Sequence, residues 1–116
     1  MQVDFSFVPI TEDLPEGADF AILMEDDSMA PYFPEGAAVY FTRRETPEEL
    51  QPGLFYHRGT LLVRQWCEDC TGTLHLLCAN PRREAMNLHL DGREKAACLC
   101  LGAALCKKPL PMPLYP

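Results

Sequence analysis

The chain has 116 residues, a length typical of one domain with one hydrophobic core. Its formal net charge is −7, from 17 acidic and 10 basic residues, so the chain by itself is a poor candidate for binding nucleic acid, which requires neutralisation of phosphates. Its 11 prolines are about twice the average usage and favour strands and turns over long helices.

Neither a membrane span nor a secretory signal is predicted. No apolar run approaches the roughly 18 residues that cross a bilayer, and residues 1–4 lack the basic flank of a signal peptide. We therefore expect a soluble, cytoplasmic protein without membrane contact, whose cysteines are reduced thiols and not disulfides. The six cysteines are Cys67, Cys70, Cys78, Cys98, Cys100 and Cys106.

The first half of the chain is predicted to contain an arm and two strands. Residues 1–18 read as an extended N-terminal arm that ends in a turn. Residues 19–24 form an apolar run of strand length, and the acidic residues that follow place Ser28 at a strand end. The β-branched and aromatic content of residues 37–42 predicts a second strand, followed by a loop or single helical turn over residues 43–49.

The second half is predicted to continue as short strands. Residues 54–57 and 60–66 are expected to pair as a hairpin around the turn at Arg58 and Gly59. The other predicted segments of this half are a strand at 74–79, a strand at 86–90, a turn at 91–92 and a core segment at 96–105.

The predicted elements define both the organisation of the chain and its fold class. We divide the chain into the arm of residues 1–18, a domain of residues 19–106 and a proline-rich tail of residues 107–116, which we expect to be extended or disordered and not helical. Short strands at regular spacing, with little helical periodicity, predict an all-β architecture, either partly barrel-like or made of two sheets.

Several short motifs occur in a definite order along the domain. Arg64 follows Ser28 by 36 positions. The motifs are Asp27-Ser28-Met29, Pro34-Glu35-Gly36, Gln51-Pro52-Gly53, Leu62-Val63-Arg64, Ala79-Asn80-Pro81 and the segment 99–104. Together they resemble the self-cleaving Ser-Lys domain of LexA, phage CI-type repressors and UmuD proteins, over about residues 19–105.

The resemblance implies a LexA-like fold of mostly antiparallel strands, partly barrel-like, and assigns roles to particular residues. Ser28 matches the nucleophile, Asp27 and Met29 its neighbours, and Arg64 the lysine that acts as general base. A neutral lysine can take the serine proton, but a guanidinium stays protonated and has no lone pair to accept it. Arg64 therefore argues against catalysis.

Other departures from the family pattern agree with this interpretation. Asp26 replaces the glycine that precedes the Asp-Ser pair, and Ala37 and Leu54 stand where the family often has aspartates. No Ala-Gly or Cys-Gly pair precedes Ser28 to serve as a scissile bond. We expect a degenerate, non-proteolytic domain, in which Arg64 is either a surface residue or, as we prefer, pairs with Asp26 or Asp27.

The primary functional hypothesis is the regulatory and dimerisation domain of a prophage-type, XRE- or LexA-like transcriptional repressor, without a cofactor. The resemblance implies a homodimer, formed through the later strands and the C-terminal segment, and DNA contact only through a helix-turn-helix segment absent from this chain. One alternative is a working Ser-Lys peptidase. Another is a module that holds an extended peptide as an added strand in the vestigial cleft.

A metal site is a weaker alternative. Cys67 and Cys70 have the Cys-x-x-Cys spacing of half a zinc knuckle, with His75 and Cys78 nearby as further candidate ligands. The second half of such a site is missing, so we predict no metal. His57, His75 and His89 are scattered, and each is expected to pack or face solvent.

Overall fold

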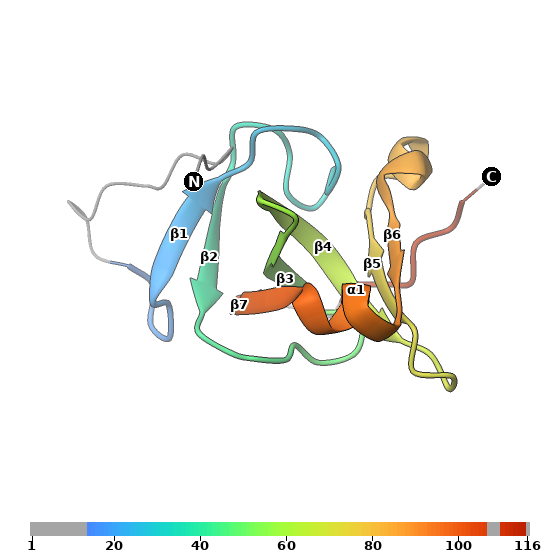
Figure 1. Cartoon of the computed structure of the whole chain (residues 1–116). Helices are drawn as coiled ribbons and strands as arrows, with labels where there is room; N and C mark the ends of the chain where they lie inside the picture. The colour runs from blue at the N-terminus through green and yellow to red at the C-terminus, as the bar shows by residue number, and fades with distance from the viewer. Residues whose placement is uncertain (1–13, 107–109, 116) are drawn as a thin grey trace.

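The computed structural model of the chain, which describes residues 14–106 and 110–115, contains one antiparallel sheet of seven strands in the order β1-β2-β7-β3-β4-β5-β6 (Figure 1). The all-β prediction is confirmed. The sheet is open, because β1 and β6 at its two ends are not paired with each other. The strands are β1 (Phe20–Leu23), β2 (Ala38–Thr42), β3 (Pro52–His57), β4 (Thr60–Glu68), β5 (Leu74–Leu77), β6 (Leu88–Leu90) and β7 (Leu99–Ala104).

The predicted hairpin joins β3 to β4 at the centre of the sheet. Leu54 lies opposite Val63, and the ladder closes where His57 pairs with Thr60. Between them Arg58 and Gly59 have φ angles of 49° and 80°. Positive φ at both central residues is the geometry that lets a two-residue turn match the twist of its flanking strands. The turn chemistry of this short segment therefore fixes the register of the longest pairing.

Two short helices occupy stretches that the sequence left polar or assigned to a turn. The 3-10 helix η1 (Pro81–Met86) begins after Asn80, whose side chain caps the Arg82 N–H. The predicted turn at residues 91–92 is wrong, because Asp91 is the N-cap residue of α1 (Gly92–Ala97). Five residues of good helix-forming type, Arg93 to Ala97, follow a permissive glycine there, and a short helix results.

The expectation that residues 96–105 lie wholly in the core is also wrong. In β7, Leu99 is 55% exposed and Leu101 is 39% exposed, while Gly102 and the alanines after it are buried. Strand geometry explains the difference, since successive side chains point to opposite faces. Cys100, between the two leucines, packs against buried core residues. The first half of β7 thus exposes two apolar side chains, those of Leu99 and Leu101.

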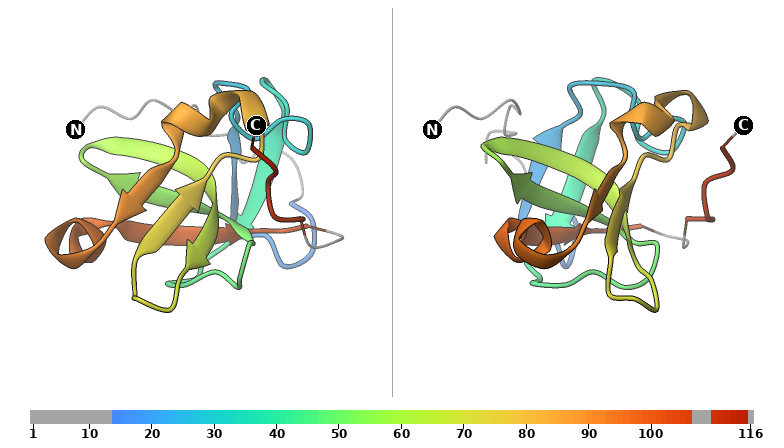
Figure 2. Two further views of the ribbon diagram at one scale, coloured as in Figure 1. Left: turned by 90° about the vertical axis from the view of Figure 1, so that its right-hand side faces the viewer. Right: turned by 45° about the vertical axis from the view of Figure 1, so that its right-hand side comes forward.

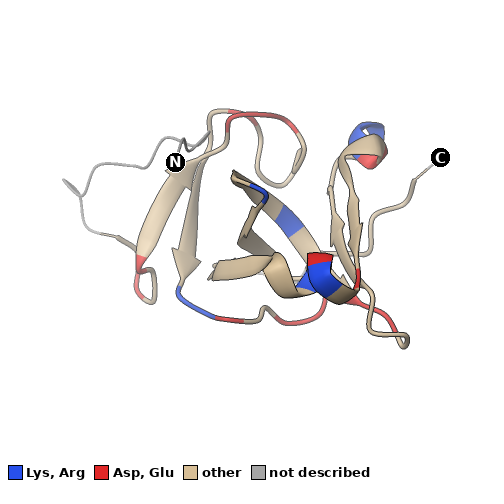
Figure 3. Cartoon of the chain, viewed as in Figure 1, with Lys and Arg blue, Asp and Glu red and all other residues tan. Residues whose placement is uncertain are grey.

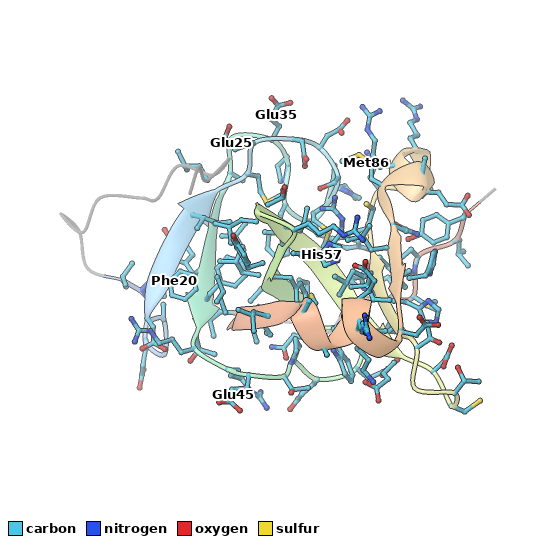
Figure 4. All side chains as sticks on the ribbon, viewed as in Figure 1. Phe20, Glu25, Glu35, Glu45, His57 and Met86 are labelled. Atoms are coloured by element: carbon cyan, nitrogen blue, oxygen red, sulfur yellow. The ribbon has the colours of Figure 1, made fainter. Side chains whose placement is uncertain are left out.

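The core consists of two clusters of buried side chains. Leu54 and Phe55, adjacent on β3, belong to different clusters, as expected for neighbours on a pleated strand. The larger cluster gathers between β1, β2, β3 and β4, where side chains fill the space between the strands (Figure 4). Phe41 in this cluster stacks on Phe20, with ring centroids 5.4 Å apart. This larger cluster also contains Met29, which is fully buried and anchors the loop that follows β1.

The two ends of the chain lie partly outside the described residues. The predicted N-terminal arm falls on residues 1–18, of which residues 14–18 form a turn before β1. Of the proline-rich tail, residues 110–115 are described, and they are neither helix nor strand, as expected. Within the described ranges, no helix combines the length and the apolar character needed to cross a bilayer.

Gly102 on β7 packs closely against the end of β2. A Cβ atom added there would lie 2.9 Å from the backbone oxygen of Thr42 and 3.0 Å from Cζ of Phe20. We predict that Gly102→Ala lowers the free energy of unfolding by about 3 kcal/mol, because a ladder oxygen cannot move aside as a flexible side chain can. Urea denaturation measures this.

Gly59→Ala is the matched control, since the added Cβ meets nothing within 4 Å and only the positive φ of 80° opposes it. That variant should lose about 1 kcal/mol. A Gly102→Ala variant that loses no more than Gly59→Ala would show that the two strands are not in the close contact described.

Candidate functional site

Ser28 lies in the loop that joins β1 to β2, and local hydrogen bonds fix its backbone. The Asp26 side chain accepts the Ser28 N–H at 3.0 Å, which is the turn that an aspartate two residues earlier favours. From outside the loop, the Asn80 N–H donates to the Ser28 carbonyl oxygen at 3.0 Å, and Asn80 Nδ2 donates to the Asp27 carbonyl oxygen at 2.9 Å. The serine is therefore held by its own loop and by the segment after β5.

The structure brings Ser28 and Arg64 together. Arg64 Nη1 donates to Ser28 Oγ at 3.1 Å and to the Val63 carbonyl oxygen at 2.8 Å. Ser28 Oγ donates in turn to Asp26 Oδ1 at 2.6 Å. Both side chains are inaccessible to solvent, with Ser28 0% and Arg64 3% exposed. The Arg64 Nε atom is buried without an acceptor. The result is a chain from a buried guanidinium to a buried hydroxyl to a partly exposed carboxylate.

The expected pairing of Arg64 with an aspartate is corrected by these contacts. Arg64 is not a surface residue, and among the described residues no ion pair joins it to Asp26 or Asp27. It reaches Asp26 only through Ser28 Oγ. Asp27 instead takes two hydrogen bonds from Arg83, at 2.7 and 3.0 Å. The serine hydroxyl occupies the place where a direct salt bridge would form.

Arg83 is a site residue that sequence reasoning missed. Its fork of N–H groups matches the Asp27 carboxylate, and the hydrogen bonds from Arg83 lower the pKa of Asp27. The Asn80-Pro81 pair, which predicts a chain reversal, was the available signal, because Asn80 caps the helix on which Arg83 lies. The sequence alone could not show that this helix faces the Ser28 loop.

The arrangement has a restricted chemistry. Arg64 can only donate hydrogen bonds. Ser28 Oγ therefore accepts a hydrogen bond from Arg64 and donates one to the Asp26 carboxylate. A carboxylate is a much weaker base than the neutral amine of a Ser-Lys dyad. Met29, the other predicted neighbour, is fully buried in the core and takes no part in the polar chain. These contacts tie a loop to a strand and do not activate a nucleophile.

The cysteine alternative is not supported by a cluster of ligands. Among residues 14–106 and 110–115, no three His, Cys, Asp or Glu side chains are placed to hold a metal ion. Cys67 and Cys70 lie at and beyond the end of β4, while Cys78 is buried after β5. Burial and the nearby Glu49 raise the pKa of the Cys67 thiol to about 11. This thiol is therefore protonated at neutral pH.

Two histidines that the sequence left scattered are joined by strand register. His75 on β5 pairs with His89 on β6, and their Nδ1 atoms are 2.7 Å apart. His75 Nε2 lies 2.8 Å from Asp69 Oδ2, and the hydrogen bonds from Thr71 and His75 lower the pKa of Asp69. Only the pairing of β5 with β6 reveals this trio, since His75 and His89 are 14 residues apart.

The coupling between Ser28 and Arg64 can be measured by a double-mutant cycle. We predict that Ser28→Ala costs about 2 kcal/mol of unfolding free energy in the native background, because it leaves a buried Arg64 donor without its acceptor. In an Arg64→Met background the same change should cost about 1 kcal/mol less. Urea denaturation of the four proteins gives the coupling.

The control cycle combines Ser28→Ala with Arg44→Met, since Arg44 is exposed on the loop after β2 and makes no contact with Ser28. Its two changes should add within about 0.5 kcal/mol. Equal coupling in both cycles would mean that the contact between Ser28 and Arg64 contributes nothing specific.

Comparisons with known proteins leave the family of this chain open. No family model matches the sequence, and a search of the curated proteins finds no match. The resemblance to LexA-like domains therefore depends on the order of motifs around Ser28.

Proposed function

We propose that this chain is the regulatory and dimerisation domain of a prophage-type, XRE- or LexA-like transcriptional repressor, and that it does not cleave itself. The observation that carries the proposal is the 3.1 Å contact between Arg64 and Ser28. These are the two positions that the family pattern assigns to the base and the nucleophile. Residues 36 positions apart, on a loop and on a strand, are in contact, as the two members of a Ser-Lys dyad need to be.

The same contact argues against proteolysis. The guanidinium of Arg64 cannot accept the serine proton, and Ser28 is fully buried, so no scissile carbonyl can approach Oγ without opening the loop. What remains is a structural connection. It joins the β1–β2 loop to β4, while Asn80 and Arg83 join the same loop to the segment after β5.

The distribution of charge favours DNA contact through a separate segment. In the part of the chain that the structure describes, lysines and arginines lie on β4, on the β3–β4 turn, on the two short helices and on the loop after β2, spread over the molecule (Figure 3). A net charge of −7 also disfavours binding to phosphate. In this proposal a helix-turn-helix segment reads the operator in the cytoplasm, and this domain joins two such segments.

The exposed edge of β7 supports a dimer of this kind. β2 pairs with β7 at Ala103 and Ala104, and among residues 14–106 and 110–115 no strand pairs with the β2-facing side of β7 from Leu99 to Leu101. The side chains of Leu99 and Leu101 are exposed, although the rest of β7 packs into the core. Isologous contact between two such edges buries apolar surface and satisfies unpaired backbone groups together.

Absence of self-cleavage is the first prediction. Incubated at alkaline pH with its native upstream segment, the chain should yield no fragment that the Ser28→Ala variant lacks, and a fluorophosphonate should not label Ser28. The reason is that no neutral amine lies beside Oγ. Mass spectrometry reads both results.

Arg64→Lys is the companion variant, since it restores the amine of the family. Labelling of Ser28 in that variant alone would assign the loss of activity to the base. A Ser28-dependent fragment from the unaltered chain would contradict the proposal and favour the alternative of an active Ser-Lys peptidase.

Dimerisation is the second prediction. Light scattering at micromolar concentrations should give twice the chain mass of 13.1 kDa, and the double substitution of Leu99 and Leu101 by glutamate should give the monomer, because it places charge in an apolar contact. Met86→Glu is the matched control, since Met86 is 39% exposed, as Leu101 is, but lies on η1. A monomer from the unaltered chain would contradict the proposal.

A further inference from the structure

The described part of the C-terminal tail, residues 110–115, is attached to the body of the protein at both of its ends. Near its start, Gln65 Nε2 on β4 donates to the Pro111 carbonyl oxygen at 3.1 Å. At its end, the Tyr115 hydroxyl donates to the Cys78 carbonyl oxygen at 2.6 Å. Figure 2 shows the segment along the outer side of the molecule. A stretch without regular structure thus takes a defined course.

The segment lies along a groove in the body, and a cavity remains between the two. The cavity has a volume of about 250 Å³, and its body-side wall comes from Pro31 and Tyr32 of the β1–β2 loop, Gln65 of β4, and Ala79 and Pro81 after β5. In this wall Gln65 carries an amide and Tyr32 a hydroxyl, and no member is charged. Such a wall suits an apolar, extended peptide that forms a hydrogen bond with the amide.

Gln65 has an unused acceptor. Its side chain is 0% exposed, and its Nε2 donates to two carbonyl oxygens, those of Leu50 and Pro111, both at 3.1 Å. Because both partners are acceptors, the amide orientation is fixed, and Oε1 is left buried with no donor. A buried amide oxygen without a hydrogen bond is unfavourable, and it is present while the tail occupies the groove.

The sequence of the tail explains why Gln65 Oε1 receives no hydrogen bond from it. In an extended chain, the N–H and the carbonyl oxygen of one residue point to the same side, so a facing amide can bond to both. Residue 111 offers its carbonyl oxygen to Gln65, but it is a proline and has no N–H. Any other residue type at this place could supply the donor that Oε1 lacks.

We propose that the groove along Tyr32, Gln65 and Ala79 is a binding site for an extended, apolar peptide of a partner protein whose residue facing Gln65 carries a backbone N–H, and that residues 110–115 occupy it as a weaker internal ligand. The tail of a second copy of the chain carries the same Pro111, so it would bind the groove no better than the chain's own tail. The preferred occupant therefore has a different sequence. This proposal holds whether or not the domain belongs to a repressor.

The first test compares three fluorescein-labelled hexapeptides by fluorescence polarisation on the full chain. One has the tail sequence Leu-Pro-Met-Pro-Leu-Tyr, the second has alanine at its second position, and the third has N-methylalanine there. The alanine peptide should bind about tenfold more tightly than the other two, because it alone donates to Gln65 Oε1. N-methylalanine keeps the alanine side chain and removes only the N–H.

Variants of the chain test the internal competitor. Tyr115→Phe removes the hydroxyl that holds the tail to Cys78, so it should raise the affinity for the alanine peptide several-fold. Pro111→Ala should lower that affinity, since the improved tail competes better, whereas Pro15→Ala, in the exposed turn before β1, should leave it unchanged. Each variant is first shown to be folded by its circular dichroism spectrum.

Equal affinities for the alanine and N-methylalanine peptides would overturn the role of Gln65 Oε1. Peptide binding that does not respond to Tyr115→Phe or Pro111→Ala would overturn the competition, because the peptide would then occupy another surface. If the unaltered chain forms a dimer, and its affinity for the alanine peptide falls as the dimer forms, the groove belongs to a second copy of the chain. That result would overturn the proposal of a partner peptide.

Discussion

The buried contact of the Arg64 guanidinium with the Ser28 hydroxyl is the constraint on which the site depends. An arginine that is 3% exposed needs acceptors, and here it has a hydroxyl and a carbonyl oxygen, with the Asp26 carboxylate one hydrogen bond further away. Removing a partner from such a charge is strongly unfavourable. The β1–β2 loop is therefore locked onto β4 as long as Arg64 remains in place.

The position of the loop determines what surrounds it. With Ser28 fixed, Asp27 faces η1 and is paired with Arg83, and the Asn80 side chain closes on the Asp27 carbonyl oxygen. Pro31, three residues beyond Ser28, then forms one wall of the groove that the C-terminal segment occupies. One polar contact thus fixes a loop that carries both Ser28 and one wall of the apolar groove.

Sequence reasoning located the strands well and the side-chain partners poorly. The hairpin at Arg58 and Gly59 was predictable because turn chemistry and β propensity are local. The proximity of Ser28 and Arg64 was expected only through the motif order. The partner of Asp27, the pairing of His75 with His89 and the exposure of Leu99 depend on register and strand order, which no local pattern encodes.

The imperfect hydrogen bonding of β4 links the two proposals. Among the described residues, the buried side-chain polar atoms without a partner are Arg64 Nε and Gln65 Oε1, a donor and an acceptor on adjacent residues. Native proteins leave few such atoms, and functional sites are where they are kept. Arg64 and Gln65 each form some of their hydrogen bonds and leave one buried atom unpaired, and both proposals start from these two residues of β4.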